Sequence, residues 1–484
     1  MSVDYRHGKG ALRKAVLPII IFALMMLVAC QGTDSATSAP GEILTAKPER
    51  ATATKTAEAQ RENKPGPTTP NSATPAPTGQ EMTLDRIAYI NSNGDLLTIN
   101  PDGSDIKALT AGVQASTGST GRAIAQPLNL DRFYAWPTWS PDGSQIAVSR
   151  VQAASGGSQI SLEIVNTTTV RERTAYVNTA GGLVAQGAPH YIYWSPSSRY
   201  LSFLASTADG LTLFVKDTEA DAEAVEVSVG APLYWHWRQD DSALLLHNGT
   251  EIELAEAPFQ QEPRKLISSP SPFRVPAISP DGARFAYINV DQEGSSLVVA
   301  SLDSPENGIK LLGVGAISAF AWSPDGTEIA VADQQNTRTP VYQKLQVVSA
   351  TDANQVRTIT EEPVLSFFWS PQGDTFAWVG FDVENSSFEW TVADRSGDSV
   401  KRLFKFQPSN DIFTMLSFFD QYAYSNSPWS PDGAHLVVAG TPEGVTRSGN
   451  GQSPTRDRIY VLDATGEQPP LDIAGGTVAF WSWN

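Results

Sequence analysis

The sequence has few residues of the kinds that hold metals or carry redox chemistry. Among its 484 residues there is one cysteine, Cys30, and there are five histidines. A single cysteine excludes an intramolecular disulfide, so the fold must depend on packing alone. No two histidines stand at zinc-ligand spacing, and "NSNGD" at 91–95 lacks the spaced carboxylates of a calcium loop. We therefore expect no metal and no cofactor.

Basic residues and the common catalytic motifs are also scarce. There are 34 Lys and Arg against 52 Asp and Glu, which gives a net charge of −18. So acidic a chain repels phosphate backbones, which argues against nucleic acid as a partner. The sequence contains no G-x-S-x-G, no P-loop, no G-x-G-x-x-G after a strand and no H-E-x-x-H.

One apolar run, "AVLPIIIFALMMLVA" at 15–29, follows four basic residues. Fifteen residues are too few for a comfortable membrane span and typical of a signal peptide. The run ends in "LVAC" at 27–30, which resembles a bacterial lipobox. This resemblance implies that residues 1–29 are removed and that Cys30 carries lipid, as palmitate or a related acyl chain. The alternative is an ordinary signal peptide followed by an incidental cysteine.

Residues 31–80 contain no Phe, Trp or Tyr and are rich in Thr, Ala, Pro and Ser. Such a segment cannot bury enough apolar surface to offset the entropy of ordering. We expect residues 30–82 to be the lipidated cysteine and a disordered stalk. Aromatic residues and alternating apolar patterns begin near residue 83, so the folded part should be 83–484.

A short motif recurs along the folded part. "WSPDG" stands at 139–143, 322–326 and 429–433, and near-copies are "WSPSS" at 194–198, "ISPDG" at 278–282 and "WSPQG" at 369–373. With Trp237 and Trp481 added as anchors, the spacings fall between 41 and 60 residues, which is typical of propeller blades. Short apolar segments bounded by turn signals follow every anchor except Trp481. Each unit should therefore be four short antiparallel strands.

The motif itself reads as a turn. Pro presets φ for the turn, Asp can bond locally and Gly closes it. Two copies lose the Asp and keep the turn, so we interpret Asp142, Asp325 and Asp432 as turn residues rather than catalytic or metal-binding groups. The preceding Trp should be an apolar plate that packs on a neighbouring sheet.

The two ends of the folded part complement each other. Residues 86–110 read as three strands without an anchor, and "GTVAFWSWN" at 476–484 reads as one strand with its anchor. We predict an all-β fold: an eight-bladed β-propeller of four-stranded antiparallel blades, closed by pairing of the C-terminal strand with the N-terminal strands. The expected blades are blade 1 at 84–110 plus 476–484, blade 2 at 132–180, blade 3 at 188–229, blade 4 at 232–268, blade 5 at 273–313, blade 6 at 316–361, blade 7 at 363–406 and blade 8 at 424–474.

The repeated "WSPDGxxIAF"-like unit resembles the repeat of the TolB-type propellers, which are related in pattern to WD-repeat propellers. The resemblance covers residues 84–484 and implies a scaffold or binding platform, often in the bacterial cell envelope. TolB has fewer blades and a separate N-terminal domain, so its own partners are not carried over. Peptidase families with propellers place their chemistry in a hydrolase domain for which this chain has no room.

Long insertions at 111–135, 407–427 and 440–457 should share the face opposite the "SPDG" turns, where binding loops are commonly placed. In the second of these, apolar residues at helical spacing predict a short amphipathic helix. Its aromatic residues either form a ligand platform or plug the central channel. His236, between two tryptophans, either contacts a ligand at the channel mouth or packs between blades. The candidate partner-binding residues are Trp136, His190, Tyr191, Trp235, His236, Phe413, Phe418, Phe419, Asp420, Tyr422, Tyr424 and Arg447.

These observations lead to two functional hypotheses. The first is a monomeric, lipid-anchored binding or scaffold protein outside the cytoplasm, at the cell surface or in the periplasm. It would hold a protein, peptide or glycan partner on the long-loop face. The alternative is a propeller enzyme, a lyase or glycan hydrolase, at the mouth of the channel. Such an enzyme needs paired carboxylates or a base near the axis. Asp411 and Asp420 are the best candidates, but the first strands carry few acids, which favours binding.

Overall fold

The computed structural model describes residues 85–110, 132–154, 157–178, 190–268, 270–271, 274–315, 317–334, 341–382, 387–445 and 457–483. The predictions for the signal peptide, Cys30, the stalk and Arg447 lie outside these residues, as does the side chain of His190. The described secondary structure consists of strands, two short α-helices and one 3-10 turn, η1 (Pro305–Asn307), which confirms the all-β prediction.

Five sheets have four antiparallel strands each, as the repeat predicts. The first contains β4 (Arg132–Trp139), β5 (Gln145–Ala154), β6 (Gly157–Asn166) and β7 (Glu172–Asn178). The second contains β8 (His190–Trp194), β9 (Tyr200–Thr207), β10 (Gly210–Asp217) and β11 (Val225–Val229). The third contains β12 (Leu233–Trp237), β13 (Ala243–Asn248), β14 (Glu251–Glu256) and β15 (Arg264–Ser268). The fourth contains β16 (Ala277–Ile278), β17 (Arg284–Asp291), β18 (Gly294–Ser301) and β19 (Ile309–Val314), and the fifth contains β20 (Ile317–Trp322), β21 (Glu328–Gln334), β22 (Lys344–Ser349) and β23 (Val356–Thr360).

A sixth sheet has ten strands and joins the two ends of the folded part. Its order is β24 (Val364–Trp369), β25 (Thr375–Asp382), β26 (Ser387–Asp394), β27 (Val400–Pro408), β28 (His435–Pro442), β29 (Arg458–Asp463), β30 (Leu471–Trp481), β1 (Ile87–Asn91), β2 (Leu96–Ile99) and β3 (Lys107–Ala108). Residues 471–475 of β30 pair with β29, and residues 476–481 pair with β1. Where β30 passes from one partner to the other, a Cβ on Gly476 would lie 2.6 Å from the carbonyl oxygen of Ile90.

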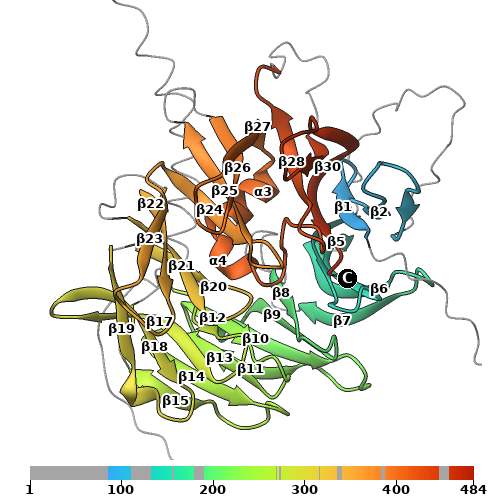
Figure 1. Cartoon of the computed structure of the whole chain (residues 1–484). Coiled ribbons are helices and arrows are strands. Elements are labelled where there is room, and N and C mark those ends of the chain that lie inside the picture. The colour runs from blue at the N-terminus through green and yellow to red at the C-terminus, as the bar shows by residue number, and fades with distance from the viewer. Residues whose placement is uncertain are drawn as a thin grey trace, which may run out of the picture. The chain divides into compact units, whose positions relative to one another are not determined.

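Consecutive sheets are neighbours in space. In Figure 1 the colour proceeds around the helices from green through yellow to red, and blue β1 lies beside red β30. The second strand of each sheet is buried on both sides, as in β21, where Ile329 to Gln334 are all buried. The residues of the outer strand β23 (Val356–Thr360) vary more in burial along the strand, because one of its edges faces solvent. Sandwiching between sheets therefore explains the continuous apolar runs in the second strands.

The anchor tryptophans join each sheet to its neighbour by a hydrogen bond. Each indole Nε1–H donates to a backbone carbonyl one residue before the anchor position of the adjacent sheet. The six bonds are Trp139 to Phe480 (3.2 Å), Trp194 to Thr138 (3.1 Å), Trp237 to Tyr193 (3.3 Å), Trp322 to Ala277 (3.1 Å), Trp369 to Ala321 (3.3 Å) and Trp429 to Phe368 (3.3 Å). The sequence predicted the apolar plate, but not this repeated bond.

Two junctions lack the bond, for different reasons. Ile278 has no side-chain donor, and its backbone N–H donates instead to His236 Nδ1 at 3.3 Å. Trp481 Nε1 is buried without a hydrogen-bond partner among the described residues. The carbonyl of Pro428, which stands where the acceptor would be, accepts from the Val437 N–H at 2.9 Å.

These differences provide a matched pair of substitutions. Trp322 and Trp481 are each 4% exposed, so Trp→Phe removes a similar volume at either place. Only Trp322→Phe also breaks a hydrogen bond. We expect Trp322→Phe to lower the free energy of unfolding by about 1 kcal/mol more than Trp481→Phe, in urea titrations followed by circular dichroism. Equal losses would show that the indole bonds contribute nothing to stability.

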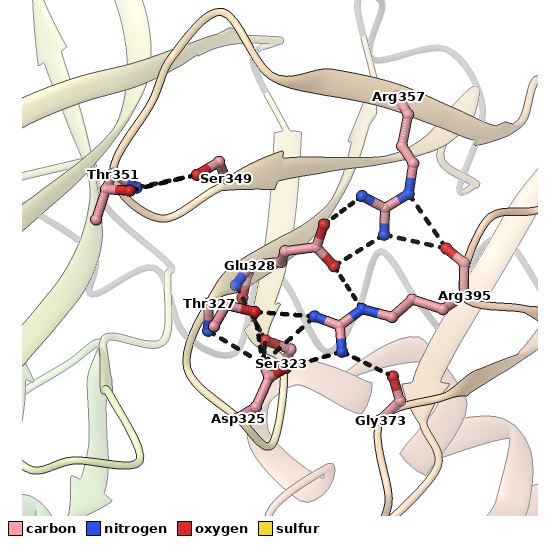
Figure 2. Close-up of polar contacts among 9 residues, drawn as sticks. All are labelled: Ser323, Asp325, Thr327, Glu328, Ser349, Thr351, Arg357, Gly373 and Arg395. Carbon is pink, nitrogen blue, oxygen red and sulfur yellow. Dashed lines mark hydrogen bonds and ion pairs between the residues drawn. The ribbon is translucent and has the colours of Figure 1, made fainter.

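A cluster of charged residues links two of the sheets at the level of the turns (Figure 2). Arg395, next to β26, donates to Asp325 Oδ2 at 2.9 Å and to Glu328 Oε2 at 2.7 Å across the junction. Arg357 also donates to Glu328 Oε2 at 2.9 Å and to the carbonyl of Arg395 at 3.0 Å. The Arg395 guanidinium lies over the ring of Trp369 at 5.5 Å. The Asp325 carboxylate thus accepts hydrogen bonds both from its own turn and from the neighbouring sheet.

The cluster predicts a pH-dependent contribution to stability. Burial alone would raise the pKa of Asp325, but hydrogen bonds from Arg395 and Ser323 bring it below its ordinary value. The Arg357 and Arg395 guanidinium groups lower the pKa of Glu328. Because folded-state pKa values are depressed, the pairing stabilises the fold above about pH 4 and is lost as the pH falls further.

We therefore expect Arg395→Ala to reduce the free energy of unfolding by about 1–2 kcal/mol at pH 7, a figure kept low because these groups are partly exposed. The loss should shrink toward pH 3. Arg402→Ala is the control, since it removes the same charge, paired with Glu362 and Glu389, from a side chain that is 52% exposed, against 30% for Arg395. A loss for Arg395→Ala that stays constant with pH would contradict the ionic origin.

Candidate binding cavity at the turn face

The "SPDG" segments form hydrogen-bonded turns. In the first, the Gly143 N–H donates to the Ser140 carbonyl at 2.9 Å, and Ser140 Oγ donates to Asp142 Oδ1 at 2.6 Å. Ser323 with Asp325 and Ser430 with Asp432 repeat the side-chain bond. This local bonding is what the turn interpretation predicts for the three aspartates.

Neighbouring turns also pack on one another. Gly373 has φ +73°, and a Cβ there would lie 2.9 Å from Cδ of Pro324 in the preceding turn. Gly326, with φ +67°, faces Pro280 in the same way at 3.3 Å. The glycine therefore serves a second purpose besides closing its own turn, since it leaves room for the proline of the adjacent sheet.

The turns surround a cavity of about 500 Å³ at the centre of their face, which we call the turn-face cavity. The third residue of every motif lines it. Six of these residues are prolines, namely Pro141, Pro196, Pro280, Pro324, Pro371 and Pro431. The other two are Gln239 and Trp483. Pro324, Pro371 and Gln239 are exposed and the others are half-buried, so the cavity opens to solvent.

The floor of the cavity is formed by an insertion at the inner edge of the ten-stranded sheet. Residues 406–408 pair with the end of β28, and Trp429 bridges to Leu436 at its beginning. Between them, residues 409–428 leave the sheet and form α3 (Asn410–Ser417) and α4 (Phe419–Tyr422). We call residues 409–428 the plug. Ala423, Tyr424, Ser425 and Ser427 of the plug line the cavity.

Local sequence explains why the plug is helical. Ser409 caps α3 by accepting a hydrogen bond from the Ile412 N–H at 3.2 Å, and Asp411 lies in the first turn, where a carboxylate favours the helix dipole. The predicted helical spacing is confirmed, although the helix breaks at Phe418. Ile412, Met415 and Leu416 are its buried residues.

Aromatic contacts hold the plug against several sheets. Tyr422 stacks on Trp136 with centroids 5.6 Å apart and contacts Tyr191 edge-on at 5.6 Å. Phe419 contacts Phe367 at 4.8 Å and is 1% exposed. Asn426 Nδ2 donates to the Pro137 carbonyl at 3.1 Å. The rings of Phe419 and Tyr422 are therefore packed against other aromatic rings and are not available as a ligand platform.

His236 lies at the boundary of plug and cavity. It is 5% exposed, and Tyr424 contacts its ring edge-on at 4.3 Å. Burial lowers the pKa of His236 to about 3, so its imidazole is neutral and its Nδ1 accepts the bond from Ile278. His236 therefore packs against Tyr424 and the neighbouring sheet, and it also lines the turn-face cavity.

The two candidate acids lie elsewhere in the plug and do not line the turn-face cavity. Burial raises the pKa of Asp420 to about 6, against the opposing charge of Arg274. Burial also raises the pKa of Asp411, which a side-chain hydrogen bond with Thr477 partly opposes. A raised carboxyl pKa is suited to general acid–base chemistry, but neither group lines the turn-face cavity.

The lining of the turn-face cavity is uncharged. None of the described residues that line it is Asp, Glu, Lys or Arg. The anchor indoles that reach it are at most 9% exposed, and their flat faces are packed between sheets. The lining residues that are not buried are the six prolines, Gln239, Ala423, Tyr424, Ser427 and Trp483. A wall with so many apolar groups and no charge suits an apolar segment.

Solved structures of TolB β-propeller proteins resemble the chain. TolB from Acinetobacter baumannii is 15% identical, with a TM-score of 0.37 over 70% of this chain and 84% of that one. Oligogalacturonate lyase from Vibrio parahaemolyticus is 12% identical, with a TM-score of 0.44 over 66% and 87%. The β-propeller domain of the Trilobed protease from Pyrococcus furiosus is 11% identical, with a TM-score of 0.44 over 72% and 99%. No family model matches the chain.

The structure separates the candidate residues into groups. His236 and Tyr424 line the turn-face cavity, whereas Trp136, Tyr191, Phe419 and Tyr422 form the packing around the plug. Trp235 is fully buried and donates to Ser202 Oγ at 2.8 Å, so it is not presented to a partner. Phe413 and Phe418 are half-buried at the plug, and Phe413 contacts Phe388.

The third motif position was not among the candidate residues predicted from the sequence. The prediction of a binding surface on the long-loop face stays a prediction, and the turn-face cavity lies on the opposite face. The signal was available in the aligned copies, where this position reads Pro, Pro, Gln, Pro, Pro, Pro, Pro and Trp. Within the described segments, no group of three His, Cys, Asp or Glu is placed to hold a metal, and no helix is long and apolar enough to cross a membrane.

Proposed function

We propose that the protein is a binding protein outside the cytoplasm that holds an uncharged peptide segment of a protein partner in the turn-face cavity. The sheets would form a closed ring of eight blades, in which β24–β27 is blade 7, residues 429–475 contribute blade 8, and residues 476–481 with β1–β3 make blade 1. The pairing of β30 with both β29 and β1 supports this closure.

One observation carries the proposal: the third residues of all eight motifs, spread over more than 300 residues of sequence, meet around a single cavity. A volume of about 500 Å³ is ample for a few apolar side chains. The carboxamide of Gln239 can pair with a peptide group at the wall. Because the lining has no charge, a charged ligand would lose hydration without compensation.

A propeller enzyme remains the alternative, and Asp420 is the observation that favours it. Its pKa of about 6 would suit an acid or a base. A glycan hydrolase, however, needs a pair of carboxylates flanking one bond, and the cavity lining provides none. Turnover of oligogalacturonate by the full chain, lost in Asp420→Asn, would overturn the binding proposal in favour of the enzyme.

Attachment to a membrane through lipid on Cys30 also belongs to the proposal. The motif "LVAC" after the apolar run supports it. A protein with Cys30→Ser that stays in the membrane fraction after cell lysis would contradict it.

The binding site can be tested with a random dodecapeptide library displayed on phage, selected on the full chain in detergent. Ala423 lies on the cavity floor, so Ala423→Trp should fill the cavity and weaken the selected peptides at least about tenfold. Leu471→Trp, on an outer strand, is the control and should leave binding unchanged. Circular dichroism should show that both variants are folded. Peptides that bind Ala423→Trp unchanged would place the site elsewhere.

A further inference from the structure

The third motif positions, which form the outer wall of the turn-face cavity, are uniform except at two places. Six blades contribute the same pyrrolidine ring at the same position of the same turn. A ring of equivalent apolar groups can hold an apolar segment, but it cannot distinguish one orientation of that segment from another. Within this ring of third positions, selection of orientation or sequence comes from the two that differ, Gln239 and Trp483.

The side chain of Gln239 is exposed at the cavity, and no hydrogen bond is described for it. Its turn is nevertheless fixed. Asp241 accepts hydrogen bonds from Ser195 Oγ at 3.0 Å and from the Ser197 N–H at 3.2 Å, both in the neighbouring blade. A carboxamide offers both a donor and an acceptor, which match the C=O and N–H of a peptide group. Gln239 therefore presents a carboxamide with no described hydrogen bond on a turn that is bonded to the neighbouring blade.

Trp483 follows β30 and is the one half-buried indole at the cavity. Its backbone is positioned by the preceding residue, because the Ser482 N–H donates to the Arg86 carbonyl at 2.8 Å and Ser482 Oγ accepts from the Arg86 N–H at 3.2 Å. The anchor Trp481, two residues earlier, is 4% exposed and packs in the core. Trp483 thus adds a second, more accessible indole in the place that proline occupies in six other blades.

We propose that Gln239 and Trp483 are the specificity-determining residues of the cavity, an inference that depends on the proposed function. Trp483 takes an apolar or aromatic side chain of the ligand, since a large ring contributes much contact area at little entropic cost. Gln239, three blades away around the ring, pairs with a peptide group of the same segment. The ligand class is an uncharged peptide that presents an aromatic or large aliphatic residue at a fixed distance from an unpaired amide.

The test uses individual peptides selected from the phage library on the wild-type full chain, and measures their affinities by fluorescence anisotropy. Trp483→Ala and Gln239→Ala should each weaken binding about tenfold or more. Trp483→Phe should restore most of the loss, because it keeps an aromatic ring. Pro196→Ala and Pro371→Ala are the controls within the wall, and they should change affinity less than about threefold.

The outcomes separate this inference from the proposed function. Suppose that the selected peptides compete with each other and do not bind Ala423→Trp, but bind Trp483→Ala and Gln239→Ala as tightly as the wild type. That result would overturn the roles of Trp483 and Gln239 and would leave the cavity as the binding site. Equal losses of affinity in Pro196→Ala and Pro371→Ala would also overturn the roles of Trp483 and Gln239, since all the wall positions would then contribute equally to recognition. Failure to select any peptide on the wild type would overturn both proposals.

Discussion

A chain that lacks residues 476–484 is expected to lose its cooperative fold. The deletion removes the half of β30 that pairs with β1 from Ile87 to Asn91. Val478, Ala479, Phe480 and Trp481 are each 4% exposed or less, so their burial is lost. At about 1.5–3 kcal/mol for each large apolar side chain, this loss alone is comparable with the 5–15 kcal/mol that stabilises a typical domain.

The deletion also exposes surfaces that favour aggregation. The edge of β1 would lose its partner, and an unpaired strand edge is a template for pairing with another chain. The Trp139 indole would lose its acceptor on Phe480. Size-exclusion chromatography and thermal unfolding by circular dichroism should show aggregated or non-cooperative material.

Deletion of residues 483–484 alone is the matched control for closure. It leaves β30 intact and should give a soluble protein with a cooperative transition. If the 476–484 deletion also unfolds cooperatively as a soluble monomer, the ring does not depend on this strand, and closure of eight blades would be refuted.

The repeat made the fold readable from the sequence, because strand length, turn chemistry and apolar runs are local properties. The complementary ends at 86–110 and 476–484 even predicted which strands pair at the closure. The indole bonds were not predictable from one copy, since they join a side chain to a backbone carbonyl in another sheet. The missing bond of Trp481 likewise depends on the neighbouring sheet, where the Pro428 carbonyl already accepts from the Val437 N–H.

The turn-face cavity was not predicted, for a related reason. Long loops and aromatic residues are local features of the sequence, and they led to the prediction of binding residues in the plug and on the long-loop face. The cavity instead arises from convergence, because each motif contributes one residue, a proline in six of the eight, that has a local role in its own turn. Reading the motif down its columns, rather than along the chain, would have found Gln239 and Trp483.

The plug is expected to be part of the core rather than a movable lid, and Phe419→Ala tests this. Phe419 is 1% exposed and contacts Phe367 at 4.8 Å, and Phe368 and Tyr342 at 6.0 Å each. Removing a fully buried phenyl ring costs about 3–5 kcal/mol through lost burial and the cavity left behind. We expect a loss of this size in the free energy of unfolding, measured by urea titration.

Phe413→Ala is the matched control, because Phe413 is half-buried on α3 and contacts Phe388 at 5.8 Å. It should cost about 1 kcal/mol. If the plug could leave the ring while the sheets stayed folded, Phe419→Ala would scarcely change the global transition, and the amides of residues 410–426 would exchange with solvent independently. A full loss in one cooperative transition would instead mean that the ring folds around the plug, so that the floor of the turn-face cavity is present whenever the blades are.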